Sequence, residues 1–230
     1  MIDVANLPHD FCIGCYVPRY LWDGEEPPHG FTDFIAAIKA FSIVDEIETE
    51  QAIENAILLL SENICGFNAV TVVPSHSKGG NAHAGIFRIA AGLAERSNGK
   101  VIDATSCLHR IHTVEKLAGG GDRAKDTHIN SIQLRNPDFI KGKKVLLLDD
   151  VRCTGNSLAA CREILEGAYP KAVHPFALAQ SLNDNGENLE TTYARVEYRL
   201  HMAYQIEHQG LDFEQNREQS ALSQMYDFAR

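Results

Sequence analysis

The sequence lacks a long hydrophobic run. None of its apolar stretches approaches the roughly 20 consecutive residues that a helix needs to cross a bilayer. The N-terminus also lacks the basic and then apolar layout of a secretory signal. We therefore expect a cytoplasmic protein without a membrane partner. Internal repeats, low-complexity segments and a clear linker are missing as well, so we count one domain, residues 31–230, behind an irregular N-terminal arm, residues 1–30.

The chain also lacks an excess of positive charge. Its 21 lysine and arginine residues stand against 31 aspartates and glutamates, which gives a net charge of −10. This acidity argues against a general nucleic-acid-binding surface, so we do not expect nucleic acid as a direct partner. Residues 78–152 have the opposite balance, with 13 basic against 8 acidic side chains. A binding site for a small polyanion explains this basic span at least as well as a site for DNA.

The sequence also lacks the cysteine pattern of a disulfide framework. The six cysteines are spread along the chain, and four of them lie in apolar or motif contexts that suit reduced thiols. Cys12 and Cys15 form a CxxC pair with His9 and His29 nearby. Such a pair is half of a zinc site, a redox pair or two unrelated thiols. The spacing matches no standard zinc finger, and we assign no dedicated metal site.

Short apolar runs alternate with segments of helical periodicity. The runs predict strands at residues 69–74, 101–104, 145–148 and 173–179. The periodicity predicts helices at 31–41, 46–63, from about 83, and from the end of the loop at Ser157 to about 167. This alternation indicates an α/β fold with an open, mostly parallel sheet flanked by helices. We also expect an edge strand at 193–199. A last helix at 212–230 is expected to dock on its own domain or on a second subunit, as in a homodimer.

One stretch organises the rest of the chain. The apolar strand at 145–148 is followed by Asp149 and Asp150, by a loop with Thr154 and Gly155, and then by a helix start. Backbone N–H groups of such a turn and the positive end of the helix dipole bind phosphate, while carboxylates accept hydrogen bonds from sugar hydroxyls. The stretch therefore predicts a site for a phosphorylated sugar.

A second loop of this kind follows the strand at 69–74. It offers hydroxyls, a point charge and a glycine that lets the backbone approach a ligand, and its residues are Ser75, His76, Ser77, Lys78 and Gly79. Between the two loops, residues 110–130 lack sustained periodicity and are long, basic and rich in glycine. That composition favours a flexible lid rather than a packed element. The side chains in it that could meet a substrate are Arg110, Lys116, Arg123, Lys125 and His128.

These features carry a resemblance. The acidic pair and the loop at 153–157 are similar to the phosphoribosyl-pyrophosphate (PRPP) motif of type I phosphoribosyltransferases, in which two acidic residues precede a Thr-Thr-Gly-x-Thr-like loop. Cys153 replaces the first threonine and Ser157 the last. The order of elements over 31–180 most resembles the competence-type ComF proteins, whose first helix ends near a lysine comparable to Lys39. This chain has one CxxC pair where ComF proteins have two, and it lacks their Arg-Gly-Phe-Asn stretch.

The resemblance implies a phosphoribosyltransferase that displaces pyrophosphate from Mg²⁺-PRPP with a nitrogen acceptor, such as a nucleobase. It implies that Asp149 and Asp150 hold the ribose hydroxyls and favour the positive sugar, that the loop at 75–79 binds pyrophosphate, and that Mg²⁺ arrives with the substrate. The 5′-phosphate and ribose would be bound by Asp149, Asp150, Arg152, Cys153, Thr154, Gly155, Asn156 and Ser157. Two other functions stay open: a catalytically silent PRPP- or nucleotide-binding regulator, and a ComF-like accessory protein of DNA uptake or defence. The acceptor is not encoded in any pattern that we can interpret.

Overall fold

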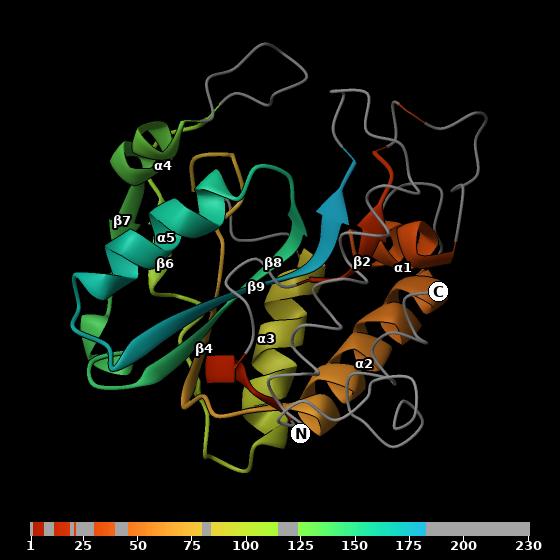
Figure 1. Ribbon diagram of the computed structural model, residues 1–230, viewed down its shortest axis with the longest axis horizontal. Helices are drawn as coiled ribbons and strands as arrows, with labels where there is room; N and C mark the ends of the chain where they lie inside the picture. Colours follow the sequence, from red (N-terminus) through yellow and green to blue (C-terminus); the bar gives the residue numbers. More distant parts are fainter. Residues whose placement is uncertain are drawn as a thin grey trace. The chain divides into compact units, whose positions relative to one another are not determined.

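The computed structural model describes residues 2–6, 12–18, 21, 30–39, 46–79, 84–114 and 124–182 (Figure 1). The chain forms two compact units. Unit 1 comprises residues 1–66, 150–153 and 177–230, and unit 2 comprises residues 67–149 and 154–176. Among the described helices, none is both long and apolar enough to cross a membrane.

Five strands form one sheet in the order β2-β9-β8-β4-β5. They are β2 (Cys12–Tyr16), β4 (Ala69–Val72), β5 (Ile102–Asp103), β8 (Lys144–Arg152) and β9 (Ala172–Ser181). The pairs β2–β9, β4–β8 and β4–β5 run parallel, with Cys12 opposite Ala177 and Ala69 opposite Val145. The predicted open, mostly parallel α/β sheet is therefore confirmed.

The apolar run of β8 occupies the middle of this sheet. Its residues from Val145 to Leu148 are each at most 1% exposed, and β4 beside it is buried along its whole length. A strand buried on both faces requires such a continuous apolar run, since both faces of a parallel sheet are covered. Burial of this run fixes the position of the polar residues that follow it in the chain.

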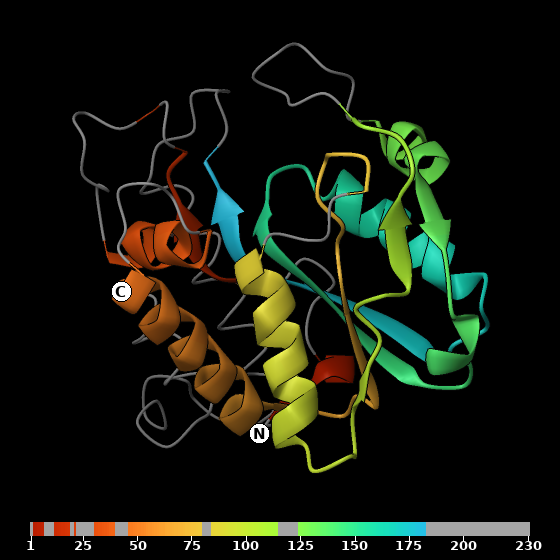
Figure 2. The ribbon, with the colours of Figure 1, turned by 180° about the vertical axis from the view of Figure 1, so that it is seen from behind.

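In unit 2, helices pack against the strands of the sheet. Helix α3 (Ala84–Arg96) packs against β4 and β5 through Ile86, Ile89 and Leu93. A small antiparallel pair, β6 (Leu108–Arg110) with β7 (Ile132–Leu134), lies with α4 (Lys125–Ser131) and α5 (Asn156–Glu166), as both views show (Figures 1 and 2). The short 3-10 helix η4 (Pro137–Phe139) precedes β8.

Unit 1 contains the N-terminal elements. Helices α1 (Gly30–Ile38) and α2 (Glu46–Asn63) pack together, and β1 (Ile2–Asp3), which leads into the 3-10 helix η1 (Val4–Asn6), pairs with β3 (Ile64–Cys65). Helix α1 lies so close to β2 that a Cβ atom on Gly14 would come within 2.5 Å of the Phe31 ring. Thr32 also accepts a hydrogen bond from the Val17 N–H at 3.1 Å. Glycine inside the CxxC pair therefore serves helix packing.

The structure corrects two predictions of local conformation. Residues 12–16, expected to be irregular, form β2 and are buried. Arg110 and residues 125–130, placed at the start and the end of the predicted lid, belong to β6 and α4. A single sequence does not reveal β6, because β6 and its described partner β7 are only three residues long. The domain boundary at residue 30 stays a prediction. Residues 115–123, the strand at 193–199 and the helix at 212–230 lie outside the described residues.

Candidate functional site

Strand β8 continues through the acidic pair. Asp149 and Asp150 were expected to follow the strand, but β8 ends only at Arg152. Successive side chains of a strand point to opposite faces, so the two carboxylates have different neighbours. Asp149 belongs to unit 2 and is half-buried, whereas Asp150 belongs to unit 1 and is 8% exposed. The pair therefore offers two distinct carboxylates rather than a single acidic turn.

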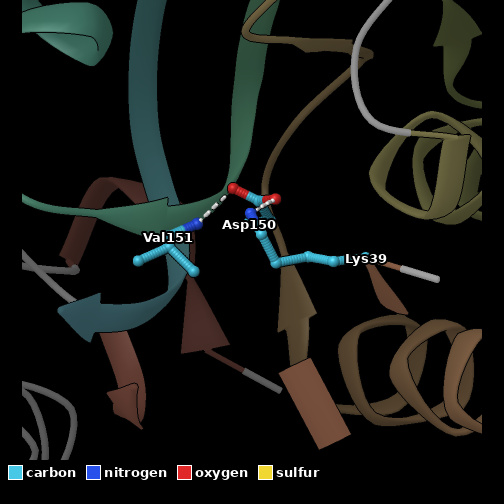
Figure 3. A network of polar contacts seen from close by, with 3 residues as sticks. All are labelled: Lys39, Asp150 and Val151. Atoms are coloured by element: carbon cyan, nitrogen blue, oxygen red, sulfur yellow. Dashed lines mark hydrogen bonds and ion pairs between the residues drawn. The ribbon is translucent and has the colours of Figure 1, made fainter. Parts of the chain in front are cut away.

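Both carboxylate oxygens of Asp150 have protein partners. Oδ1 accepts the Val151 N–H at 2.6 Å, and Oδ2 forms an ion pair with the Lys39 ammonium group just after α1 (Figure 3). The two side chains are only 11% and 18% exposed. A carboxylate this far from water is stable as an anion only when it is paired and hydrogen-bonded. Lys39 thus supplies the positive charge that Asp150 requires.

The motif loop leads directly into α5. Gly155 is the residue before the helix and has φ = +83°, a left-handed conformation that glycine adopts without steric cost. The Thr154 hydroxyl accepts the Asn156 N–H at 3.4 Å, and the first turn of α5 carries no acidic side chain. Asn156 and Ser157 are helical residues. The helix dipole and the first N–H groups of α5 can therefore receive an anion without a competing carboxylate in that turn.

Sequence reasoning missed Gln180, a buried residue of β9. Its amide group donates to the carbonyl oxygens of Cys153 and Ser181, both at 3.1 Å. Its Oε1 accepts the Arg152 Nε–H at 2.9 Å. All these residues belong to unit 1, so one side chain fixes both the guanidinium and the loop backbone at the end of β8. Its distance of 27 residues from Cys153 left no local pattern that could reveal it.

The loop at 75–79 is held by the segment that follows β6. The Gly79 N–H donates to the Arg110 carbonyl, the Lys78 N–H to the Thr113 hydroxyl, and the Val114 N–H to the His76 carbonyl, each at 2.9 Å. Ser77, Lys78 and Gly79 are exposed, while Ser75 and His76 are half-buried. The loop is therefore tied along its length and presents its tip to solvent.

Arg110 and His128 do not lie on an exposed lid, and this part of the prediction is wrong. Arg110 is 1% exposed, and His128 of α4 is 4% exposed, with its Nε2 at 3.3 Å from the Ser157 hydroxyl. Lys125 forms an ion pair with Glu163 on α5. His128 and Lys125 instead connect α4 to α5. Lys116 and Arg123 lie outside the described residues, and lid closure stays a prediction.

The buried cysteines have the character of structural thiols. Three positions apart in one strand, Cys12 and Cys15 point to opposite faces, so they are not placed to share one zinc ion. Burial raises the pKa of Cys107 to about 11, with a smaller contribution from Asp103. The pKa of Cys161 is also raised, by burial and then by Asp149. Within the described residues, no group of three metal-ligating side chains occurs.

Comparison with known proteins gives one short sequence match. Over 43 residues the chain is 49% identical to an adenine phosphoribosyltransferase of Treponema denticola. The match covers 19% of this chain and 23% of that enzyme, so the chain matches less than a quarter of that enzyme's length. No family model matches the sequence.

Solved structures were compared as well. A hypoxanthine phosphoribosyltransferase of Staphylococcus aureus is 14% identical with a TM-score of 0.33, and the match covers 71% of this chain and 81% of that one. A hypoxanthine-guanine phosphoribosyltransferase of Bacillus anthracis is 14% identical with a TM-score of 0.36, over 73% and 80%. Scores this low carry no argument about function. The short sequence match is the finding that indicates similarity to a phosphoribosyltransferase, and it does not show closeness to ComF proteins.

Proposed function

We propose that the protein is a phosphoribosyltransferase that transfers the phosphoribosyl group of Mg²⁺-PRPP to a nitrogen acceptor. The observation that carries the proposal is the end of β8: two carboxylates, then a loop closed by left-handed Gly155, then the start of α5. The short match to an adenine phosphoribosyltransferase supports the same class. The order of elements still favours ComF proteins within that class.

Different residues would bind the different groups of the substrate. Backbone N–H groups and hydroxyls of Thr154, Gly155, Asn156 and Ser157 would bind the 5′-phosphate, as phosphate is bound at other helix N-termini. Asp149 and Asp150 would accept hydrogen bonds from the ribose hydroxyls, with Arg152 and Cys153 completing that end of the site. The exposed tip of the loop at 75–79, with Lys78, would bind the pyrophosphate group.

The reaction would break the bond between ribose C1 and the pyrophosphate oxygen and form a bond from C1 to the acceptor nitrogen. Positive charge develops on the sugar, and the two carboxylates stabilise it electrostatically. Negative charge develops on the departing pyrophosphate, and the positive charge of Lys78 stabilises it electrostatically. Mg²⁺ would enter as part of the substrate, because it keeps several waters and binds chiefly to substrate oxygens. The half-buried Asp149 suits such a substrate-borne ion.

A thermal-shift titration with Mg²⁺-PRPP tests binding. A ligand at one hundred times its dissociation constant stabilises the folded protein by about 2.7 kcal/mol, so the wild type should show a clear rise in Tm. The variant Asp149→Asn/Asp150→Asn should shift much less. Asp138→Asn, which alters an exposed aspartate of η4, is the matched control and should behave as the wild type. A wild type without a shift, or a double variant with a full shift, would exclude PRPP binding at this motif.

Turnover distinguishes the enzyme from a regulator. Release of pyrophosphate from Mg²⁺-PRPP in the presence of a panel of nucleobases is expected for the transferase. Binding without turnover of any acceptor would favour the catalytically silent regulator, for which Cys153 in place of a motif threonine is the supporting observation. Salt-sensitive binding to a DNA duplex would instead favour the ComF-like accessory protein.

A further inference from the structure

Arg110 is a buried arginine that donates to two backbone carbonyls and one side-chain hydroxyl. It lies at the end of β6 in unit 2, and it is among the largest fully buried side chains in the described part of the chain. Its Nε donates to the Ser75 carbonyl at 2.9 Å, and one terminal nitrogen donates to the Pro74 carbonyl at 3.4 Å. The other terminal nitrogen donates to the Ser131 hydroxyl of α4. The guanidinium therefore joins the end of the 69–74 segment to α4.

The same residue also holds the loop through its backbone. Its carbonyl accepts the Gly79 N–H at 2.9 Å, so Arg110 contacts both ends of the loop at 75–79. An arginine satisfies this arrangement because its planar fork carries five donors in fixed directions. A lysine would bring the charge but could not reach two carbonyls and a hydroxyl in that plane. The geometry depends on the guanidinium and not merely on its charge.

A chain of contacts leads from Arg110 to the second phosphate loop. The Ser131 hydroxyl, which accepts from Arg110, donates to the His128 carbonyl at 2.9 Å. The His128 ring in turn contacts the Ser157 hydroxyl at 3.3 Å. All of these residues belong to unit 2. The loop at 75–79 and the first turn of α5 are thus supported by one buried polar network.

We propose that Arg110 is a positioning residue that sets the conformation of the loop at 75–79 for a pyrophosphate group. The inference rests on the proposed function. Arg110 is buried and does not itself touch the ligand; it fixes the loop whose exposed tip, with Lys78, does. Its buried positive charge beneath the loop adds an attractive potential for a polyanion, in the part of the sequence that is basic. The connection from Arg110 to Ser157 runs through two intervening residues, Ser131 and His128.

Separate titrations with the two halves of the substrate test this role. The probes are Mg²⁺-pyrophosphate and ribose 5-phosphate, followed by calorimetry, with far-UV circular dichroism to verify folding. Arg110→Lys should weaken pyrophosphate binding about tenfold, because at least one hydrogen bond to the loop is lost, and should change ribose 5-phosphate binding much less. Arg135→Lys, at an exposed arginine, is the matched control and should leave both affinities unchanged.

Thr113→Val provides a second variant in case the buried substitution prevents folding. Thr113 is exposed, and its loss removes only the acceptor of the Lys78 N–H, so pyrophosphate binding should weaken while ribose 5-phosphate binding is retained. Wild-type affinity for pyrophosphate in both variants, or an equal loss of both ligands, would overturn the positioning role alone. A wild type that binds neither probe would overturn the proposed function and this inference with it.

Discussion

At the scale of single residues, the ion pair with Lys39 balances the charge of Asp150, a proposed ribose-binding carboxylate. Both side chains are largely removed from water, and the second oxygen of Asp150 is held by its own strand. The charge of Asp150 is therefore balanced by the protein before any substrate binds. Asp149 lies on the other face of β8, next to Cys161, whose pKa it helps to raise. The two aspartates are unequal, and their variants should differ accordingly.

Lys39→Met tests the ion pair. Removing the ammonium group leaves a buried carboxylate without its compensating charge, and the free energy of unfolding should fall by about 3 kcal/mol. Urea denaturation measures the change. In the double variant Lys39→Met/Asp150→Asn the uncompensated charge is gone, so most of the lost stability should return. If Lys39→Met stays within about 0.5 kcal/mol of the wild type, the range of ordinary surface substitutions, the pair is not needed for stability.

At the scale of elements, three of them contribute residues to the proposed motif or to its support. Strand β8 carries the carboxylates, α5 supplies its N-terminal N–H groups, and β9 supplies Gln180, which fixes the intervening backbone at Cys153. The first two elements are consecutive in the chain, and the motif predicted them. The third contribution comes from a neighbouring strand and depends on the pairing of the sheet.

Gln180→Leu tests the contribution of β9. The substitution removes the hydrogen bonds to Cys153 and Arg152 at nearly constant volume, so Mg²⁺-PRPP binding should weaken about tenfold. Gln180→Glu keeps an acceptor for Arg152 but places an anion against the Cys153 carbonyl, so it should also weaken binding. Gln133→Leu, at an exposed glutamine of β7, serves as the control. Equal affinities in the Gln180 and Gln133 variants would refute the role of Gln180.

At the scale of the whole molecule, burial separates the thiols into two classes. Cys12, Cys15, Cys107 and Cys161 are buried, and Cys65 and Cys153 are half-buried. The thiolate is the reactive species, and the raised pKa of Cys107 lowers its thiolate fraction further. The distribution of buried thiols over both units makes their reactivity a measure of global folding.

Thiol labelling of the native protein at pH 8 tests this division. Cys65 and Cys153 should react quickly, and the four buried cysteines should react only as the protein unfolds in denaturant. Mass spectrometry identifies the labelled positions. Mg²⁺-PRPP should protect Cys153 and leave Cys65 unaffected, because only Cys153 belongs to the proposed phosphate loop. Fast labelling of Cys161 without denaturant would contradict its burial.

Most of the sheet could be predicted from the chain, and so could the sequence features on which the proposed site depends. The apolar run at 145–148 predicted the central strand, since such a run is stable only when both faces are covered. The helix at 46–63 matched α2 because its apolar spacing and acidic first turn agree. Arg110 and residues 125–130 were misread as lid, because a three-residue strand and a seven-residue helix are too short to show periodicity.

The sequence by itself determined the alternation of the main strands and helices, the acidic pair, the glycine before α5 and the basic span that suits a polyanion. These are local properties, carried by neighbouring residues and by spacing along the chain. Only the tertiary structure decided what supports them: that Lys39 neutralises Asp150, that Gln180 fixes Cys153, and that Arg110 lies beneath a loop instead of on a lid. Each of these contacts joins residues at least 27 positions apart, and hydrogen bonds across such separations leave no periodic trace in a sequence.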